Sequence, residues 1–171
     1  MPNWCEGSLK LRSKNKENII KFIKESFIDC HYGDNVDALI EKPGIETGAV
    51  EIDIYDDESV LITLDVDKSH WIWLKDCGRS FIETDKHTWY DILARYDNYI
   101  CSFDFKTAWS IDPNDWINIS RKYNMDIRLY GIEKGMEFTQ EVEIIDGKVM
   151  YNNVKNYSDW EWECPFPKMG G

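Results

Sequence analysis

The sequence has little of what disulfide-stapled or metal-binding proteins are built from. Its 171 residues include only five Cys and three His, and no C-x-x-C pair occurs. The cysteines also stand too far apart for the usual spacing of zinc or iron–sulfur ligands: they are Cys5, Cys30, Cys77, Cys101 and Cys164. We therefore expect free thiols, with no disulfide framework, metal site or cofactor.

Long apolar runs are missing as well. No stretch approaches the roughly 18 apolar residues that a membrane-spanning helix needs, and no apolar segment follows Met1 as a secretory signal would. Together with the unpaired cysteines, this predicts a soluble protein of a reducing compartment, the cytoplasm, with no membrane partner. A chain of this length is expected to fold as one domain.

Basic residues are scarce, with 20 Lys and Arg against 32 Asp and Glu, a net charge of −12. Neutralising phosphates requires a basic surface, so we expect no direct binding of nucleic acid. The acidity is uneven, because residues 41–70 hold nine acidic and only two basic side chains. Such a segment suits a partner with a basic surface, although a negative surface also serves solubility alone.

What is present most clearly is a strand, a helix and a further strand within residues 98–138. Asp112 and Pro113 have the chemistry of a helix start, and basic residues follow near its end. The predicted helix has an apolar stripe of Trp116, Ile119 and Tyr123, and the strand before it has Tyr99, Cys101, Phe103 and Phe105 at every second position.

The remaining chain is interpreted by the same rules. Apolar alternation predicts a short strand at residues 9–12, a hairpin over residues 50–66 and a strand at 70–74. Apolar stripes predict a helix at 16–27, with Ile19, Ile20, Ile23 and Phe27, and a weaker helix at 85–96, with Trp89, Ile92, Leu93 and Tyr96. A helical turn is expected near 36–40. Asp146-Gly147 predicts a tight hairpin, and Trp160 and Trp162 are expected on one face of an edge strand or loop.

This order of elements predicts an α+β fold. We expect the split βαβ arrangement of ferredoxin-like domains, an antiparallel sheet with helices on one face. The whole chain, residues 1–171, is then a single domain with an inserted hairpin within about 29–98 and a C-terminal β-hairpin at about 136–164.

Three segments carry a family resemblance: MPNWCEG at the start, FKTAWSIDPNDWI, and RLYGIEKGMEF. They resemble the YubB-type family of plasmid and phage proteins, which have a ferredoxin-like domain. The matching positions, interpreted as structural, are Trp4, Cys5, Trp109, Pro113, Trp116, Glu133 and Gly135. The resemblance implies a bacterial host and a topology, and it implies no activity.

Catalysis has weak support in the sequence. Cys5 would need a histidine base, and His31, His70 and His87 are candidates only if folding brings one of them close. Glu133 and Glu137 could form a carboxylate pair, but a glutamate in a turn more often caps or faces solvent. We therefore expect no catalytic residues and a protein that is not an enzyme, with a cysteine- or carboxylate-dependent enzyme as the weakest alternative.

The sequence favours a non-enzymatic accessory protein that acts by protein–protein interaction. Its sharpest form is an acidic inhibitor of a host nucleic-acid-binding or defence protein, such as a CRISPR effector, because carboxylates along a hairpin can imitate a row of phosphates. The candidate partner-binding residues are Asp53, Asp56, Asp57, Glu58, Asp65 and Asp67, with Trp71 and Trp73 as neighbouring aromatics.

Two other possibilities stay open. A small-molecule or peptide-binding module would use the open face of the sheet or an aromatic cleft. A homodimer would form if a sheet edge or the aromatic C-terminal tail paired across a two-fold axis.

Overall fold

A large antiparallel sheet with helices behind it forms most of the molecule. The structure, a computed structural model, describes residues 3–31, 34, 50–64, 70–84 and 88–171. Within them the elements are β1 (Trp4–Ser13), α1 (Lys16–Ser26), β2 (Phe27–His31), β3 (Val50–Ile54), β4 (Val60–Leu64), β5 (His70–Leu74), β6 (Ser80–Ile82), β7 (Thr88–Arg95), β8 (Asn98–Ala108), α3 (Pro113–Tyr123), β9 (Asp126–Glu133), β10 (Phe138–Ile145), β11 (Lys148–Asn156) and α4 (Trp160–Glu163).

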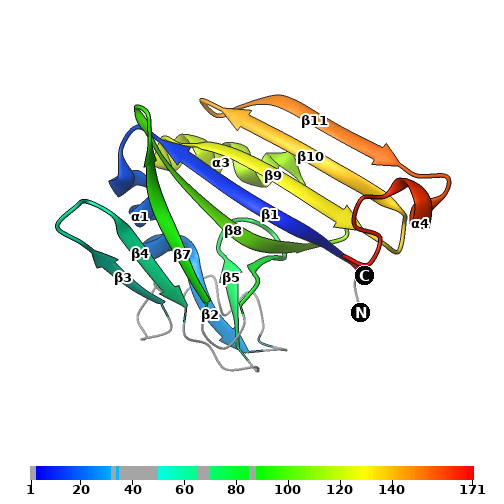
Figure 1. Cartoon of the computed structure of the whole chain (residues 1–171), viewed down its shortest axis with the longest axis horizontal. Helices are drawn as coiled ribbons and strands as arrows, with labels where there is room; N and C mark the ends of the chain where they lie inside the picture. Colours follow the sequence, from blue (N-terminus) through cyan, green and yellow to red (C-terminus); the bar gives the residue numbers. More distant parts are fainter. Residues whose placement is uncertain (1–2, 32–33, 35–49, 65–69, 85–87) are drawn as a thin grey trace.

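The main core lies between the sheet and helices α1 and α3, which cover the same face (Figure 1). Alternate residues of β1 point into it, since Leu9 and Leu11 are fully buried while Lys10 is exposed. The predicted apolar stripes are confirmed as core, with Ile19, Ile20 and Ile23 on α1 and Trp116, Ile119 and Tyr123 on α3. Phe27 is also core, but it begins β2 and does not belong to the helix. Burying these faces is the main force that holds the layers together.

The ends of α3 follow the predicted signals. The Asp112 side chain accepts a hydrogen bond from the N–H of Asn114, and Pro113 occupies the first turn, where its missing N–H leaves no bond unmade. The helix ends at Asn124, which adopts the left-handed conformation with φ of 49°. These local signals stop the helix where β9 begins.

The sheet order is β11-β10-β9-β1-β8-β6-β5-β2, and a branch runs from β8 through β7 and β4 to β3. Within the described residues, all of these strand pairs are antiparallel. The predicted α+β class with a mainly antiparallel sheet is therefore confirmed. The eleven strands of the described residues exceed a simple split βαβ sheet, because β5 and β6 stand between β8 and β2.

The length of β8 explains the branch. Its first residues pair with β7, where Ile100 lies opposite Leu93, and its last residues pair with β6, where Thr107 lies opposite Ser80. The opposite edge of β8 pairs with β1 along ten positions. One long strand thus supports two further groups of strands, and the inserted segment extends the sheet as well as forming a hairpin.

The predicted helix over residues 85–96 is wrong, because Thr88–Arg95 is strand β7. Tyr90 and Ile92 point inward, whereas Trp89 and Leu93 are exposed. Aromatic and β-branched residues favour strands, and pairing with β4 and β8 decides the outcome. The hairpin over 50–66 and the strand at 70–74 are confirmed as β3 with β4 and as β5. The expected turn near 36–40 lies outside the described residues.

The C-terminal hairpin is confirmed as β10 and β11. Asp146 and Gly147 both have positive φ, 50° and 66°, as a tight turn between twisted strands requires. The edge strand or loop expected around Trp160 and Trp162 is instead the short helix α4, capped by the Asp159 side chain on the N–H of Trp162. Trp160 is buried and Trp162 is exposed, so the two do not share an environment.

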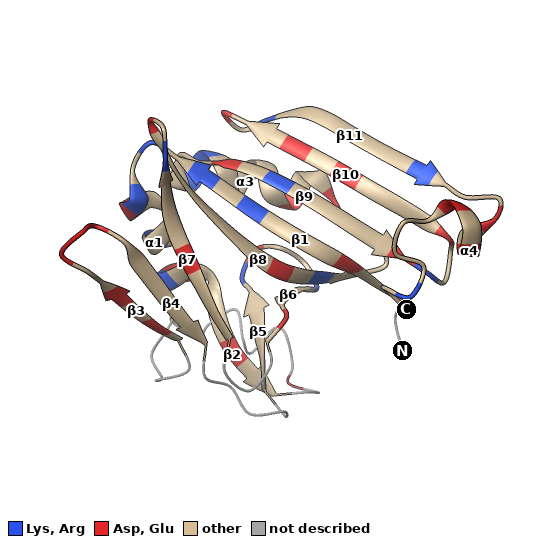
Figure 2. Ribbon diagram, viewed as in Figure 1, with Lys and Arg blue, Asp and Glu red and all other residues tan. Residues whose placement is uncertain are grey.

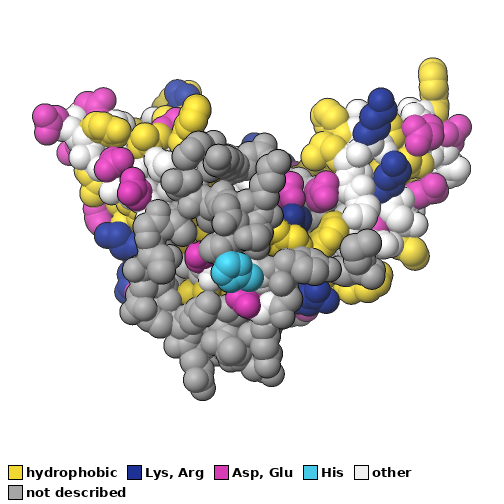
Figure 3. Space-filling view, turned by 90° about the horizontal axis from the view of Figure 1, so that it is seen from below, with side chains coloured by type: hydrophobic (Ala, Val, Ile, Leu, Met, Phe, Trp, Pro, Cys, Tyr) yellow, Lys and Arg dark blue, Asp and Glu magenta, His cyan; other side chains and the backbone are white. Residues whose placement is uncertain are grey.

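Two arms extend to the left and to the right when the molecule is viewed from below (Figure 3). The arm on the left holds β3 and β4, and the arm on the right holds β10, β11 and α4 (Figures 1 and 3). None of the helices within the described residues has the length and apolar run that crossing a bilayer requires.

Candidate functional site

The acidic hairpin of β3 and β4 ends in a turn that stands out from the sheet (Figure 2). Asp53 lies on β3, and Asp56, Asp57 and Glu58 belong to the turn segment that follows it. All four side chains are exposed. The structure therefore brings four of the six predicted carboxylates to one projecting tip. Asp65 and Asp67 lie outside the described residues.

The turn itself is ordered by local hydrogen bonds. The Asp57 carboxylate accepts bonds from the hydroxyl of Ser59 at 2.6 Å and from its N–H at 3.0 Å. Both hydrogen bonds lower the pKa of Asp57 below its ordinary value, and the bond from the Ser59 hydroxyl has the larger effect. The Nζ of Lys16, on α1, lies 3.9 Å from the Glu58 carboxylate. The tip is thus a negatively charged surface held in one shape.

The wing formed by β3, β4 and β7 has an exposed outer face. Strand register places Asp53, Leu61 and Asp91 in one row across the three strands, and Glu51, Thr63 and Trp89 in the next. The three carboxylates of these rows are exposed, and so is Trp89, at 66%. Leu93, further along β7, is 45% exposed. We call this outer face together with the turn the acidic wing.

Sequence reasoning missed the role of Trp89 because it placed this residue on the apolar side of a helix. The alternation of Trp89 and Asp91 with Tyr90 and Ile92 is the signal that identifies a strand with one open face. An exposed tryptophan framed by carboxylates has the composition of an interface anchor with a polar rim.

The predicted aromatic neighbours Trp71 and Trp73 are placed in an internal cluster. Trp73 is 2% exposed and donates its indole N–H to the carbonyl of Gly78 at 2.8 Å. Trp71 contacts Trp4 and Phe81 edge to face, with ring centroids 5.8 and 5.1 Å apart. This cluster packs on the sheet face opposite the helices, which is also the side of the wing's outer face, since Leu93 of β7 pairs with Ile100 of β8.

Lys106 closes the same cluster from the side. Its Nζ lies 4.5 Å from the ring centroid of Trp71 and 5.6 Å from that of Trp4, and it pairs with Glu83 at 2.7 Å. The charge of Lys106 is thus balanced within the protein by the Glu83 carboxylate and by the faces of two indole rings. The arrangement is that of a structural cluster.

Cys5 and Glu133 of the opening and turn motifs are both fully buried. The pKa of the Cys5 thiol is raised from 9.0 to about 12. Burial is the largest cause, and the negative charges of Glu133 and Glu6 add to it. The Glu133 carboxylate accepts the N–H groups of Gly135 at 2.8 Å and Met136 at 2.6 Å. A protonated thiol and a carboxylate bound to a turn are poorly suited to nucleophilic or acid–base chemistry. His31 is exposed, and His87 and the side chain of His70 lie outside the described part.

The other motif residues stabilise the turn, the helix and their surroundings. Trp116 is 1% exposed and packs against Phe105, and Pro113 begins α3. Gly135 has no room for a Cβ, which would collide with the Asn3 side chain. Trp109 differs, being 57% exposed in a left-handed conformation with φ of 69°.

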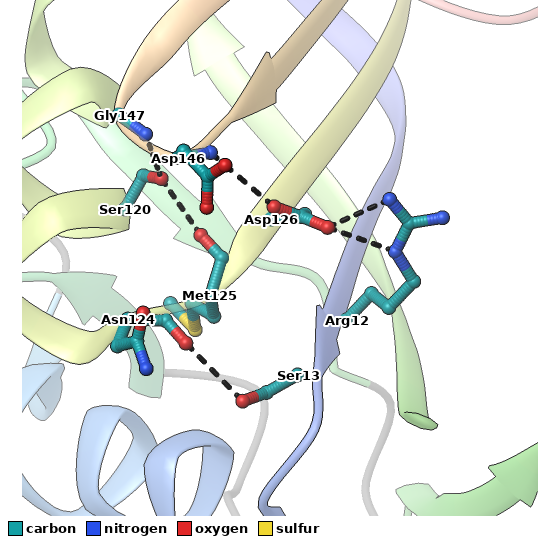
Figure 4. A network of polar contacts seen from close by, with 8 residues as sticks. All are labelled: Arg12, Ser13, Ser120, Asn124, Met125, Asp126, Asp146 and Gly147. Atoms are coloured by element: carbon teal, nitrogen blue, oxygen red, sulfur yellow. Dashed lines mark hydrogen bonds and ion pairs between the residues drawn. The ribbon is translucent and has the colours of Figure 1, made fainter. Parts of the chain in front are cut away.

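A cleft of about 520 Å³ opens where β1 ends, α3 ends, β8 begins and the β10–β11 turn passes. Figure 4 shows the polar contacts of its wall: Arg12 donates to the Asp126 carboxylate at 2.6 and 2.9 Å, and the N–H of Asp146 donates to the other oxygen of that carboxylate at 3.4 Å. The sequence analysis did not single out this cleft, because the elements that form it are far apart in the chain.

Comparison of the chain with protein-family models, curated proteins and solved structures found no match. In the described part of the chain, no three side chains of His, Cys, Asp or Glu gather in a group that could hold a metal ion. The acidic wing combines exposed carboxylates with an exposed tryptophan, and it is the candidate site that the geometry favours.

Proposed function

We propose that this protein is a non-enzymatic interaction protein that binds a partner with a basic surface through its acidic wing. The observation that carries the proposal is the outer face, where exposed Trp89 and Leu93 share the three-stranded surface with Glu51, Asp53 and Asp91. Trp109 and Trp162 are also exposed, so exposure alone does not distinguish Trp89; what does is that it shares one strand face with Leu93 and three carboxylates.

The two kinds of residue have different tasks in this proposal. Carboxylates at the rim attract a basic surface, speed its encounter and set its orientation. Trp89 supplies the apolar contact area that slows dissociation, as aromatic anchors do at most interfaces. The hydrogen-bonded turn from Asp56 to Ser59 presents the charges without a large ordering cost.

The motif resemblance and the strand order support a finer assignment within the same proposal. The central order β9-β1-β8, with α1 after β1 and α3 after β8, is the order expected of a ferredoxin-like core, here enlarged by β5, β6 and the wing. On this basis the protein is an accessory protein of a plasmid or phage, acting in the host cytoplasm on a nucleic-acid-binding or CRISPR-type defence protein.

The proposal is tested by affinity capture from a bacterial lysate at low and high salt. The neutralised variant carries Asp53→Asn, Asp56→Asn, Asp57→Asn and Glu58→Gln, and the matched control carries Glu137→Gln, Glu143→Gln, Glu161→Gln and Glu163→Gln on the opposite arm. We expect a basic protein to be retained by the wild type and the control at low salt, and lost with the neutralised variant or at high salt. Retention of the same proteins by the neutralised variant would overturn the proposal.

A further inference from the structure

The cleft beside Arg12 is unusual in this molecule because cations outnumber carboxylates on its wall. Arg12, Lys14 and Arg121 line it, together with Asp126 and Asp146, in a chain whose net charge is −12. A smaller cavity of about 190 Å³ shares Arg12 and Asp126 and adds the exposed Lys10 and Arg128, together with the carboxylate of Glu143. Five of the chain's 20 Lys and Arg thus lie in or beside this cleft, and two of the five, Arg12 and Arg128, are paired with Asp126 and Glu141.

Two of these cations are available to a ligand. Arg12 is held by Asp126, so that pair is internally neutral. Lys14 and Arg121 are exposed, and within the described residues neither has an ion-pair partner. The Asp146 carboxylate is exposed in the same cleft and likewise has no ion-pair partner there.

The walls of the cleft are braced before any ligand arrives. The Ser120 hydroxyl donates to the carbonyl of Met125 at 2.7 Å and accepts the N–H of Gly147 at 3.0 Å, which ties the β10–β11 turn to α3 (Figure 4). The Arg121 side chain lies against Gly147 so closely that a Cβ there would collide with it. The Arg121 side chain thus lies beside the braced turn at the wall of the cleft.

We propose that this cleft binds a small ligand through an oxyanion, a phosphate or a carboxylate, held by Arg121 and Lys14. A guanidinium offers paired N–H donors that match oxyanion geometry, and an ammonium adds a point charge. A cavity of about 520 Å³ is in the size range of small-molecule sites. This site is separate from the acidic wing and independent of the function proposed for it.

One electrostatic effect opposes the anion and must be weighed. The C-terminal end of α3 lines the cleft, and a helix end carries about half a negative charge. Its final carbonyl groups are partly occupied, since the Ser13 hydroxyl donates to the carbonyl of Asn124 at 3.2 Å. Two full positive charges exceed this half charge, so the cleft still favours an anion, and Asp146 is its main remaining repulsion.

The test is an NMR titration of the full-length protein with sodium phosphate and, in a second arm, with sodium succinate, each against sodium chloride at equal ionic strength. We expect saturable shifts at the amides of Asn98, Ser120 and Gly147 with at least one of the two oxyanions. The better oxyanion identifies the ligand class. Shifts that do not saturate with either anion, or that chloride reproduces, would overturn the proposal.

Two sets of variants make the test specific. Lys14→Gln with Arg121→Gln should weaken binding about tenfold or more, whereas the control Lys24→Gln with Arg79→Gln, which removes the same charges from exposed positions that do not line the cleft, should bind as the wild type does. Asp146→Asn keeps a residue suited to the turn and should strengthen binding about fivefold, because it removes the repulsion. Equal affinity of wild type and the double variant, or of wild type and Asp146→Asn, would contradict the placement.

Discussion

At the scale of single residues, the clearest feature is a buried carboxylate beside a buried thiol. Glu133 lies directly opposite Cys5 in the register of β1 and β9, and neither side chain is exposed. The carboxylate is tolerated because two backbone N–H groups of the following turn donate to it. Its charge, in turn, helps to keep the thiol protonated.

Cys5 gives a prediction about alkaline stability. Folding raises the pKa of this thiol from 9.0 to about 12, so the folded state holds the proton more tightly than the unfolded chain does. Its contribution is present in full below about pH 9 and is lost as the pH rises toward about 12. Over that window the free energy of unfolding should fall with a slope that is about 1.4 kcal/mol per pH unit shallower in Cys5→Ala. Urea unfolding at several pH values measures this, and identical slopes would contradict it.

Glu133 gives a prediction about stability at neutral pH. Glu133→Gln replaces one of two accepting oxygens by an amide that cannot accept a hydrogen bond, so it should lower the free energy of unfolding by about 2 kcal/mol. Glu137→Gln, an exposed change in the same turn, should alter it by less than about 0.5 kcal/mol. Thermal or urea unfolding of the two variants decides the matter, and equal stability would mean that the carboxylate has a role other than holding the turn.

At the scale of elements, local signals succeeded where one segment alone determines the structure. The caps of α3, its apolar stripe and the Asp146-Gly147 turn each depend on a few neighbouring residues, and all are as predicted. The prediction for residues 85–96 was wrong because Trp89, Ile92, Leu93 and Tyr96 fit a helical stripe nearly as well as a strand. Only pairing with β4 and β8 decides between the two structures.

The candidate sites, too, have parts that the local sequence predicts and parts that depend on distant strands. Charge density alone located the acidic hairpin, whereas the outer face that includes Trp89 depends on which residues lie side by side on three strands. The cleft at Arg12 was not predictable, because its walls come from β1, α3, β8 and the β10–β11 turn. The placement of β5 and β6 between β8 and β2 is likewise a long-range choice that no local pattern encodes.

The contact of β1 with β9 gives a prediction at this scale. Gly7 lies opposite Gly131, and a Cβ on Gly7 would collide with the backbone carbonyl of Tyr130. Gly7→Ala must therefore move one central strand relative to the other, and it should cost about 2–3 kcal/mol of stability. Ser8→Ala, at the next position of β1, is the matched control and should be nearly neutral. Unfolding of both variants in urea provides the comparison, and a stable Gly7→Ala protein would show that the two strands can separate freely.

At the scale of the whole molecule, charge and shape are distributed together. The acidic wing forms one arm of the molecule (Figures 2 and 3), and two cations without ion-pair partners among the described residues, Lys14 and Arg121, line the cleft at the ends of β1 and α3. Most large aromatic side chains serve the core, but Trp89, Trp109 and Trp162 are exposed, and of these Trp89 lies among carboxylates on the outer face of the wing. A surface that joins an exposed tryptophan to a rim of carboxylates has the composition of the interface that we propose for the wing.

The most direct test of the acidic wing is site-specific photo-crosslinking in bacterial cells. A benzophenone amino acid is placed at Tyr55 or Trp89 on the wing, and at Tyr151 or Trp162 on the opposite arm, all four being exposed positions. The account predicts that the wing positions crosslink a basic protein, that the opposite positions do not, and that neutralising Asp53, Asp56, Asp57 and Glu58 abolishes the product. Crosslinks from Tyr151 or Trp162 alone, or products unchanged by neutralisation, would contradict it.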